Sequence, residues 1–494
     1  MTEEAREYDI VVVGGGGAGL MAAYAAAMNG ASVIVLEKGA ELGGTTALSV
    51  GTLTATGTRL QREADITDNA DAHFEDMAKI AGSRAERDNL KLRRLLVDNA
   101  CETVDILEKL GIVFTGPLPE PPHRVPRMHA IIPHSKGFIR QLEKAARNKH
   151  AVMRTGANAQ RLITEDGRVT GVELAGGERI MVRRAVILAS GDFSAADHAY
   201  KSKYMTGPLL DIAGVNPLST GDGQRMGEAV GGEVINGDLA WGPEIRFLAP
   251  PRLSIISKLP TWRGLAKLIL LAMKILPGAV MRPFLLGFVT TFLAPSHSLF
   301  DKGAILVNSS GDRFCDERDR PQDHIGSQEG KAAWIIFGAE VADQFRSYPN
   351  FISTAPGVGY ADLTDYEKTR PDVVHKAANV EALAESIGVP SNALAGSVDA
   401  FHASRTAGDD RAAMMKPPFY ALGPVQSWIV FSEGGLKVDE NLRVLHRDGG
   451  PIPGLYAAGS AGQGGVLLEG HGHHLGWAFT SGRLAGANAV RDGV

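Results

Sequence analysis

The chain has few cysteines, no excess of charge of one sign and no long uninterrupted apolar run. Its 494 residues include only two cysteines, Cys101 and Cys315, which excludes a disulfide framework and a C-x-x-C site. This scarcity favours a reducing compartment. The formal net charge of −5 gives no signal for a nucleic-acid partner. The N-terminus is polar and acidic, without the pattern of a signal peptide, so we expect a cytoplasmic location.

The most apolar part of the chain, residues 252–294, also lacks a membrane-spanning segment. Lys267 and Lys274 interrupt its first apolar run, and Pro277 and Arg282 separate that run from the second. Neither run reaches the roughly 20 apolar residues that a transmembrane helix needs. Three interpretations remain open: a buried pair of helices in a cap, a pair of helices on a membrane surface, and an oligomer interface.

The clearest pattern that the chain does contain lies in its first forty residues. Residues 9–13 form an apolar run with the β-branching of a buried parallel strand, and a glycine-rich loop at 14–19 leads into an alanine-rich helical stretch. A second apolar run, residues 32–36, ends on Glu37. The order strand, G-x-G-x-x-G, helix, strand and acid is the dinucleotide-binding fingerprint, for which an ordinary glycine-rich loop is the alternative.

Each glycine of this fingerprint has a physical role. Gly14 makes the tight turn, Gly16 lets the pyrophosphate approach the backbone, and Gly19 lets helix and strand pack closely. The helix N-terminus presents N–H groups and the positive end of its dipole to the phosphates. Glu37 is placed to accept hydrogen bonds from ribose hydroxyls, which disfavours a 2′-phosphate there.

Further segments are consistent with a cofactor site. Residues 43–51 combine glycines with small hydroxyl side chains that can crowd a phosphate or a flat ring, although an ordinary polar turn is the alternative. A buried strand at 185–193 ends in a glycine turn, and Asp222 either caps a helix or also holds a cofactor hydroxyl. The proline-rich, basic stretch 117–133 is predicted to be a loop, either functional or simply solvated.

Seven separated segments together resemble the flavoprotein superfamily of succinate dehydrogenase, soluble fumarate reductase and 3-ketosteroid dehydrogenase. They are residues 11–19 with Glu37, 43–51, 185–193, 220–223, 303–317, 418–421 and 453–486. The resemblance implies an α/β fold, with a Rossmann-type, glutathione-reductase-like FAD-binding domain formed by both chain ends and an inserted α+β cap domain. The implied division is 1–244 and 416–494 for the two parts of the FAD-binding domain and 245–415 for the cap.

The resemblance also implies FAD as the cofactor. The residues expected to line it are Gly14, Gly16, Gly17, Ala18, Gly19, Glu37, Lys38, Gly44, Thr45, Thr46, Ser49, Gly51, Ala159, Ser190, Gly191, Asp222, Gly459, His474, Leu475 and Gly476. Members with covalently attached flavin have a histidine where this chain has Thr45. We therefore expect FAD to be bound non-covalently.

Departures from the resemblance bear on the substrate. Members that handle dicarboxylates have an arginine where this chain has His474, and Phe431 stands near the place of their histidine. Their proton-donating arginine falls at Pro321, with Arg320 one residue away. A dicarboxylate needs charge-assisted partners for both of its charges, so fumarate and succinate become poor candidates.

A neutral or monoanionic ketone fits these residues better. Dehydrogenation next to a ketone needs a base for the α-proton, a donor for the developing enolate oxygen and the flavin as hydride acceptor. Gly472 matches the backbone donor of the ketosteroid branch, whereas Leu468 replaces that branch's ketone-binding tyrosine.

The loop 469–474 contains three histidines and one carboxylate. It is interpreted as an acid/base and substrate-orienting cluster beside the flavin, with a structural loop or a metal site as alternatives. Adjacent His473 and His474 should point apart, so no metal is predicted. The candidate catalytic residues are His474, His471, Gly472 and Arg320, and secondary candidates for the far wall are Arg127, His129, Arg313 and Glu317.

The predicted function is an FAD-dependent oxidoreductase that desaturates a cyclic or lipophilic ketone, or a related carbonyl compound, next to its carbonyl. The alternatives are a fumarate-reductase-like reductase of an α,β-unsaturated acid and a non-catalytic electron-transfer flavoprotein. The expected partners are a small carbonyl substrate and an external electron acceptor or donor, with peripheral membrane contact through 252–294 and oligomer formation as further hypotheses.

Overall fold

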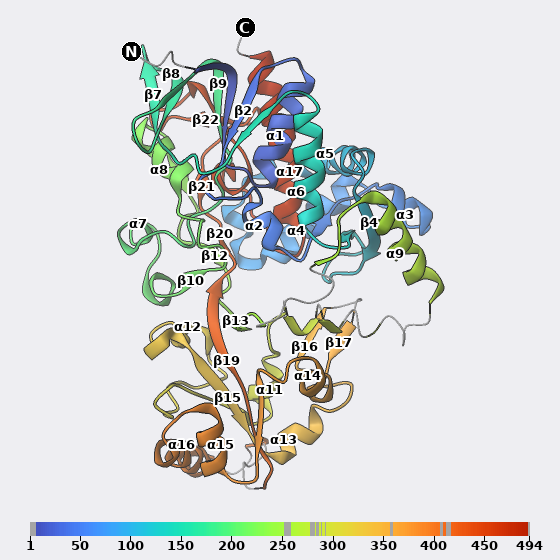
Figure 1. The fold of residues 1–494 in the computed structure, drawn as a ribbon, viewed down its shortest axis with the longest axis vertical. Helices are drawn as coiled ribbons and strands as arrows, with labels where there is room; N and C mark the ends of the chain where they lie inside the picture. The colour runs from blue at the N-terminus through green and yellow to red at the C-terminus, as the bar shows by residue number, and fades with distance from the viewer. Residues whose placement is uncertain are drawn as a thin grey trace.

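The computed structural model describes residues 6–492 apart from 251–257, 277–281, 283–285, 288, 292, 356–358, 406–408 and 412–415. Pro277 and much of the second apolar run of 252–294 therefore lie outside the described residues. Two α/β halves lie one above the other, and both chain ends belong to the upper half (Figure 1). Among the described residues, no helix is long and apolar enough to span a bilayer.

The upper half is built on a mainly parallel sheet. Its strands are β1 (Arg6–Val13), β2 (Val33–Leu36), β6 (Val152–Arg154), β7 (Ala159–Glu165), β8 (Arg168–Leu174), β9 (Arg179–Leu188), β22 (Arg443–Leu445) and β23 (Pro451–Ala457). The order is β22-β23-β9-β1-β2-β6, with β7 and β8 attached beside β9. β1 runs parallel to both β2 and β9, in the register Val11↔Ile34 and Val11↔Val186. The apolar runs that predicted parallel strands are therefore the centre of this sheet.

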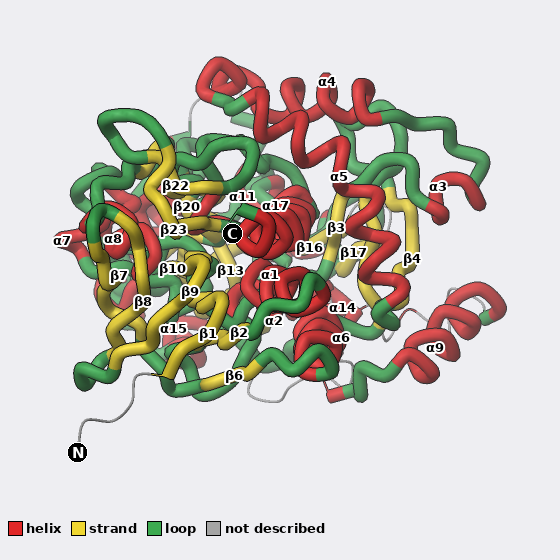
Figure 2. The backbone as a smooth tube through the Cα atoms, turned by 90° about the horizontal axis from the view of Figure 1, so that it is seen from above, coloured by secondary structure: helices red, strands yellow, loops and turns green. Residues whose placement is uncertain are grey.

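Helices from opposite ends of the chain cover one face of this sheet. They are α1 (Gly17–Met28), α6 (Lys136–Arg147) and α17 (His473–Arg491), which lie side by side in Figure 2, with α5 (Leu90–Lys109) and α4 (Ala70–Ala81) outside them. A Cβ added at Gly482 or Gly486 of α17 would lie only 2.3 or 2.2 Å from a carbonyl oxygen of α1. These glycines let the two helices approach closely, and this packing joins the first and last segments of the chain.

Smaller elements complete the upper half. They are α2 (Gly44–Leu48), α3 (Arg59–Glu63), α7 (His198–Lys201), α8 (Asp222–Ala229), α9 (Arg263–Ile275) and the antiparallel sheet of β3 (Thr52–Thr54), β5 (Met128–Ile132) and β4 (Val113–Leu118). The stretch predicted to be a loop, residues 117–133, thus includes the end of β4 and all of β5. That part of the loop prediction is wrong, because β5 pairs with strands on both of its sides, and one of them, β3, lies some seventy residues earlier in the chain.

The lower half has its own sheet and its own hydrophobic core. Its strands are β10 (Ala213–Gly214), β13 (Glu244–Phe247), β14 (Ile305–Val307), β15 (Ala333–Phe337), β18 (Val374–Ala377) and β19 (Phe419–Ile429), and a hairpin of β16 (Ser353–Ala355) and β17 (Gly359–Ala361) lies beside it. Its helices are α11 (Ser298–Asp301), α12 (Gln322–Ile325), α13 (Ala339–Gln344), α14 (Leu363–Thr369), α15 (Val380–Ile387) and α16 (Ser391–Ser404).

The long strand β19 connects the two halves (Figure 1). It pairs with β10, β13, β15 and β18, so it belongs to the lower sheet although it follows the predicted boundary at residue 416. Two short ribbons continue it into the upper half: β12 (Ala240–Trp241) with β20 (Phe431–Ser432), and β11 (Val234–Ile235) with β21 (Gly435–Leu436). The α/β prediction is confirmed, and the division at 244 and 415 stays a prediction.

Candidate active site

The two N-terminal glycine-rich loops lie against each other at the carboxyl ends of β1 and β2. An isolated parallel bridge joins Gly16 to Gly43, and the Gly43 N–H donates to the carbonyl of Gly15 at 3.0 Å. Helix α1 begins here after a glycine N-cap and has no acidic residue in its first turn. Its positive end therefore remains available to an anion, as in a pyrophosphate site.

The spacing of the fingerprint glycines fits a bound dinucleotide. A Cβ at Gly19 would lie 1.9 Å from the Gly14 carbonyl oxygen, so glycine is needed there for packing within the protein. A Cβ at Gly16 would meet no protein atom closer than 3.8 Å, and the φ of Gly16 is −81°. The protein leaves room at Gly16 that it does not fill itself, and that room matches the close approach of a pyrophosphate.

Glu37 lies at the end of β2, where a ribose is expected. This residue is 8% exposed, and its carboxylate accepts the N–H groups of Gly15 at 2.8 Å and Gly39 at 2.7 Å. Each carboxylate oxygen has a second acceptor position, which ribose hydroxyls can use. The Ala157 N–H donates to the Glu37 carbonyl at 2.8 Å, so the segment leading to buried Ala159 runs beside this residue.

Lys38 and Asp222 come together from distant segments. Their Nζ and Oδ2 atoms are 2.7 Å apart, and Thr220 donates to the same carboxylate at 2.8 Å. Asp222 is the first residue of α8, and Ser190 Oγ accepts the next N–H, from Gly223, at 2.9 Å. Asp222 is therefore an ion-pair partner in the first turn of α8. The N-cap of α8 is Gly221 and not Asp222, so the expectation that Asp222 caps this helix is wrong.

The hydroxyl side chains after the second glycine loop hold one another and the first loop. Thr46 Oγ1 accepts the Gly17 N–H at 3.2 Å, and Thr45 Oγ1 accepts from Asn216 Nδ2 at 3.0 Å. Ser49 Oγ donates to the Thr46 carbonyl at 2.8 Å. The positive φ angles of Gly44, Gly51 and Gly191, at +53°, +80° and +84°, give tight turns in the predicted FAD-lining segments.

The C-terminal segment closes this cradle from the other side. Gly459 donates its N–H to Ser481 Oγ at 2.9 Å, and Trp477 Nε1 donates to the Gly459 carbonyl at 3.1 Å. A Cβ at Gly459 would lie 2.8 Å from that of Ala18 in the first turn of α1. Leu475 and Gly476 lie in the first turn of α17, so both chain ends meet where the cofactor is expected.

The candidate catalytic residue His474 is held by a carboxylate. Its Nε2 lies 3.3 Å from Oε1 of Glu433, which is 1% exposed, and its ring packs against Phe431. Gly472, two residues earlier, is the N-cap of α17 with φ +89°. Among the described residues we find no acceptor paired with the Gly472 N–H. A proton-accepting group and a backbone donor thus stand close together at the positive end of a 19-residue helix.

The two remaining histidines of the loop occupy different environments. His471 is half exposed, and its Nδ1 lies 2.6 Å from Glu120 Oε1, which raises the pKa of the imidazole. His473 is fully buried and donates through Nδ1 to the Glu469 carbonyl at 2.6 Å. Burial lowers the pKa of His473 to about 3. The loop is therefore not a single cluster, because its histidines point to three different partners.

A cleft of about 740 Å³ opens beside this loop, between the two halves. Arg320 and Asp323 line it from the lower half, and His471, Glu120 and Trp241 line it from the upper half. Arg320 is held in a two-point ion pair with Asp323, at 2.6 and 3.1 Å.

Glu469 also lines the cleft and has an unusual charge balance. Burial, and the neighbouring carboxylates of Glu433 and Asp88, raise its pKa to about 7, although Arg84 Nε lies 2.8 Å away and opposes the shift. Glu120, Trp241 and Asp323 were missed by sequence reasoning. No motif marked them in the sequence, because Glu120 follows β4, Trp241 lies in β12 and Asp323 lies in α12, and only the fold brings these segments together at the cleft.

The structure places the secondary candidates away from this cleft. Arg127 is fully buried and ion-paired with Asp68 and Asp76, and His129 is bonded to Thr58 Oγ1 at 2.8 Å. Arg313 and Glu317 form a two-point ion pair inside the lower half. Each of these four side chains is therefore paired with a group that does not line the cleft.

Comparison with known proteins agrees with this geometry. The family model described as FAD binding domain matches residues 9–250 and 285–468. The chain is 26% identical, over 97% of its length and 92% of the relative's, to the 4-oxocyclohexanecarboxylate 2-dehydrogenase of Sinomonas cyclohexanicum. The open conformation of a flavocytochrome c3 fumarate reductase matches with 25% identity and a TM-score of 0.73, covering 99% of this chain and 79% of that one.

A third comparison concerns the fold alone. The 3-ketosteroid-Δ4-(5α)-dehydrogenase from Rhodococcus jostii RHA1 is 23% identical, with a TM-score of 0.60. The match covers 99% of this chain and 98% of that one. The predicted FAD-binding fold and the FAD cofactor are confirmed by these matches. The chain belongs to the FAD binding domain family, in the flavoprotein superfamily that includes the fumarate reductases, and is an FAD-dependent oxidoreductase acting on CH–CH groups.

Proposed function

We propose that this protein desaturates a ketone or related carbonyl compound, cyclic or lipophilic, next to its carbonyl group. We also propose that FAD is held non-covalently, since Thr45 offers only a hydroxyl that already accepts from Asn216. FAD, when bound, supplies the hydride acceptor for such a reaction. The electrons leave to an external acceptor.

The charge of the cleft carries this proposal. Its walls contain four carboxylates, those of Glu120, Asp238, Asp323 and Glu469, and two arginines, Arg84 and Arg320. Both arginines are already paired with carboxylates of the same cleft. A dicarboxylate would therefore meet like charges without a free cation among these wall residues, whereas a neutral ketone carries no such cost.

The residues around the α17 N-terminus suit the proton chemistry. His474, oriented by Glu433, is the group that we propose takes the acidified α-proton. The Gly472 N–H and the positive end of α17 stabilise the developing enolate oxygen. His471 and Arg320 line the cleft and orient the substrate there.

A flavin-bleaching experiment tests this function. Under anaerobic conditions, the oxidised enzyme is mixed with saturated cyclic ketones, with and without a carboxylate substituent, and flavin absorbance is followed. We expect bleaching with one or more ketones and none with succinate. Rapid reoxidation of chemically reduced enzyme by fumarate or acrylate, without bleaching by any ketone, would instead support the α,β-unsaturated acid reductase. If no ketone bleaches the oxidised flavin and no unsaturated acid reoxidises the reduced flavin, electron transfer would remain as the function.

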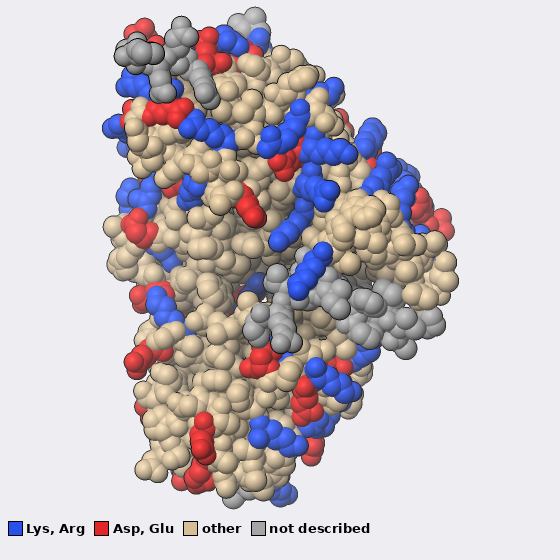
Figure 3. All heavy atoms as spheres, in the orientation of Figure 1, with Lys and Arg blue, Asp and Glu red and all other residues tan. Residues whose placement is uncertain are grey.

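We propose in addition that helix α9 rests on an anionic membrane surface, where a lipophilic substrate would be collected. Leu268, Leu271 and Ile275 form one stripe of this helix and are 61%, 52% and 69% exposed, while Ala266 on the opposite side is buried. The surface over α9, at the right of Figure 3, is mostly uncharged. Lys267 and Lys274, two turns apart, lie along one side of the stripe. An apolar stripe beside lysines is typical of an interfacial helix.

Vesicle flotation checks this interpretation of α9. The wild-type protein should float with vesicles containing phosphatidylglycerol and much less with phosphatidylcholine alone. Changing Leu268, Leu271 and Ile275 together to serine should weaken binding at least tenfold, because each buried aliphatic side chain contributes about 1.5–3 kcal/mol. Leu90→Ser, at a leucine that is 54% exposed elsewhere, is the matched control. Equal flotation of the triple variant, or none by the wild type, would contradict the proposal.

A further inference from the structure

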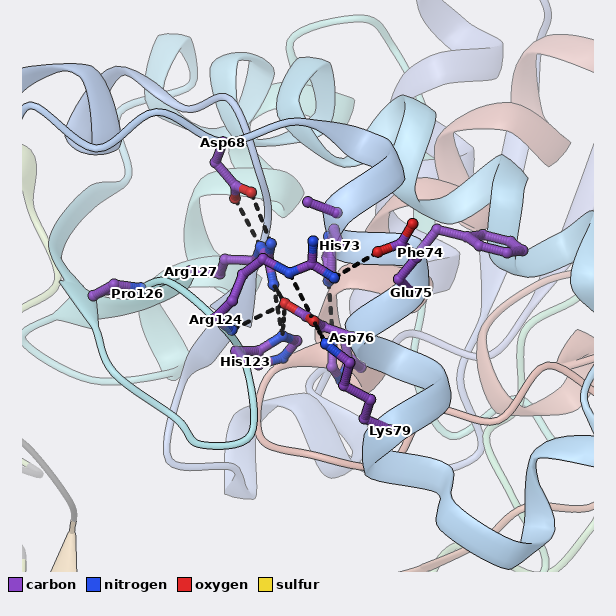
Figure 4. A network of polar contacts seen from close by, with 12 residues as sticks. Asp68, His73, Phe74, Glu75, Asp76, Lys79, His123, Arg124, Pro126 and Arg127 are labelled. Atoms are coloured by element: carbon purple, nitrogen blue, oxygen red, sulfur yellow. Dashed lines mark hydrogen bonds and ion pairs between the residues drawn. The ribbon is translucent and has the colours of Figure 1, made fainter.

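Three histidines far apart in the sequence meet inside the upper half. His73 comes from α4, His123 from the segment between β4 and β5, and His473 from the first turn of α17. The first and last are fully buried, and the His123 side chain is 1% exposed. The three ring centroids are 5.3–5.5 Å apart in pairs. Figure 4 shows two of them, His73 and His123, beside Asp76.

The ring nitrogens converge as metal ligands do. One nitrogen from each ring lies within 4.8 Å of those of the other two. His73 Nε2 and His473 Nε2 are 3.1 Å apart. Two nitrogens bound tetrahedrally at 2.0–2.1 Å to one zinc ion are separated by about 3.3 Å. This pair is therefore already at the spacing of two ligands.

The hydrogen bond of His473 directs one ring lone pair into the cluster. His473 donates its Nδ1 proton to the Glu469 carbonyl at 2.6 Å, so in the neutral ring Nε2 carries a lone pair toward His73. A ligating histidine commonly makes this second hydrogen bond to a backbone carbonyl.

Among the described residues, two nitrogens of the cluster have no hydrogen-bond partner. His123 Nε2 and His73 Nδ1 are buried and make no hydrogen bond with the described residues. Each unpaired buried polar atom costs about 1–3 kcal/mol. An ion bound at the cluster would take up His123 Nε2 and remove that cost.

Arg127 and Asp76 form a charged network on the Nδ1 side of the His123 ring. Its Nδ1 is 2.8 Å from Arg127 Nη1 and 4.0 Å from Asp76 Oδ2. Ligation through Nε2 moves the ring proton to Nδ1, where Asp76 can accept it, as in a carboxylate–histidine–metal arrangement. Arg127 then gives up only this contact and keeps its bonds to Asp68 and Asp76, at 2.6–2.7 Å.

We propose that His73, His123 and His473 bind one divalent transition-metal ion of the zinc class. A set of three imidazoles without thiolate suits zinc, and also nickel, copper(II) or iron(II). The ion would be structural, because all three side chains are buried. It would anchor α4 and the 117–133 segment to the start of α17, and so fix the loop that carries His471 and His474. The proposal does not depend on the identity of the substrate.

Metal binding by the FAD-loaded protein, prepared without a histidine tag, tests this site. The protein is treated with a chelator, dialysed, and titrated with Co²⁺ and then Zn²⁺. We expect one tightly bound ion per chain by elemental analysis, the visible bands of tetrahedral Co²⁺, and displacement of Co²⁺ by Zn²⁺. Flavin absorbance reports folding throughout and is expected to stay unchanged.

Substitutions locate the ion. His73→Gln and His123→Gln should each weaken Co²⁺ binding at least tenfold, while His446→Gln, at a histidine outside the cluster, should not. If either cluster variant fails to fold, the nitrogen coordination of wild-type Co²⁺, measured by pulsed electron paramagnetic resonance, decides whether three imidazoles bind. No stoichiometric ion in the wild type, or unchanged binding in folded His73→Gln and His123→Gln proteins, would overturn the proposal.

Discussion

Replacing Gly16 with valine is expected to give a folded protein that carries little or no FAD. The backbone of Gly16 has an ordinary φ of −81°, and its Cβ position is open, with no protein atom closer than 3.8 Å. The apoprotein therefore tolerates a side chain there, whereas a pyrophosphate approaching the α1 N-terminus does not. Overpacking costs about 1–3 kcal/mol, so FAD affinity should fall about tenfold or more. The ratio of flavin to protein absorbance and the thermal unfolding of the apoprotein measure the two effects separately.

Two matched variants give this experiment its controls. Gly396→Val also replaces a glycine with open space around it, in this case within helix α16, and it should keep a full complement of FAD. Gly19→Ala places a Cβ 1.9 Å from the Gly14 carbonyl oxygen, so it should lower the melting temperature of the apoprotein as well. A Gly16→Val protein with normal flavin content would show that the cofactor lies elsewhere.

Replacing His474 with glutamine is expected to slow flavin reduction by the ketone substrate about 10²–10⁴-fold, the usual contribution of a general acid or base. The amide keeps a polar group beside Glu433 but cannot accept the α-proton, so FAD content should stay close to that of the wild type. Anaerobic stopped-flow measurement of flavin bleaching gives the rate constant directly.

Two further variants separate the role of His474 from simple disruption of the loop. His446→Gln, at a partly exposed histidine that lies outside the loop and pairs with Asp448, should bleach at the wild-type rate. Glu433→Gln should have a smaller effect than His474→Gln, because Glu433 acts by orienting the imidazole. An unchanged bleaching rate in His474→Gln would remove His474 from the mechanism and favour a non-catalytic role for the loop.

The sequence alone determined the cofactor domain to a large extent. The spacing of strand, glycines and acid in the first forty residues predicts contacts that are local in the sequence. These contacts are present around Gly16 and Glu37. The predicted parallel strands β1, β2 and β9 also follow from local apolar runs, which only a sheet covered on both faces buries. The loop prediction for 117–133 failed where a strand depended on distant partners.

Only the tertiary structure decided how the histidines are used. Spacing along the chain groups His471, His473 and His474 in one loop, yet their partners are Glu120, His73 and Glu433, which lie 351, 400 and 41 residues away. The helix start at His473 rotates successive side chains by about 100°, so neighbours in sequence face different parts of the fold. The local sequence motifs determine which residue types lie at the expected cofactor site. Long-range packing determines which charged groups surround each of those residues.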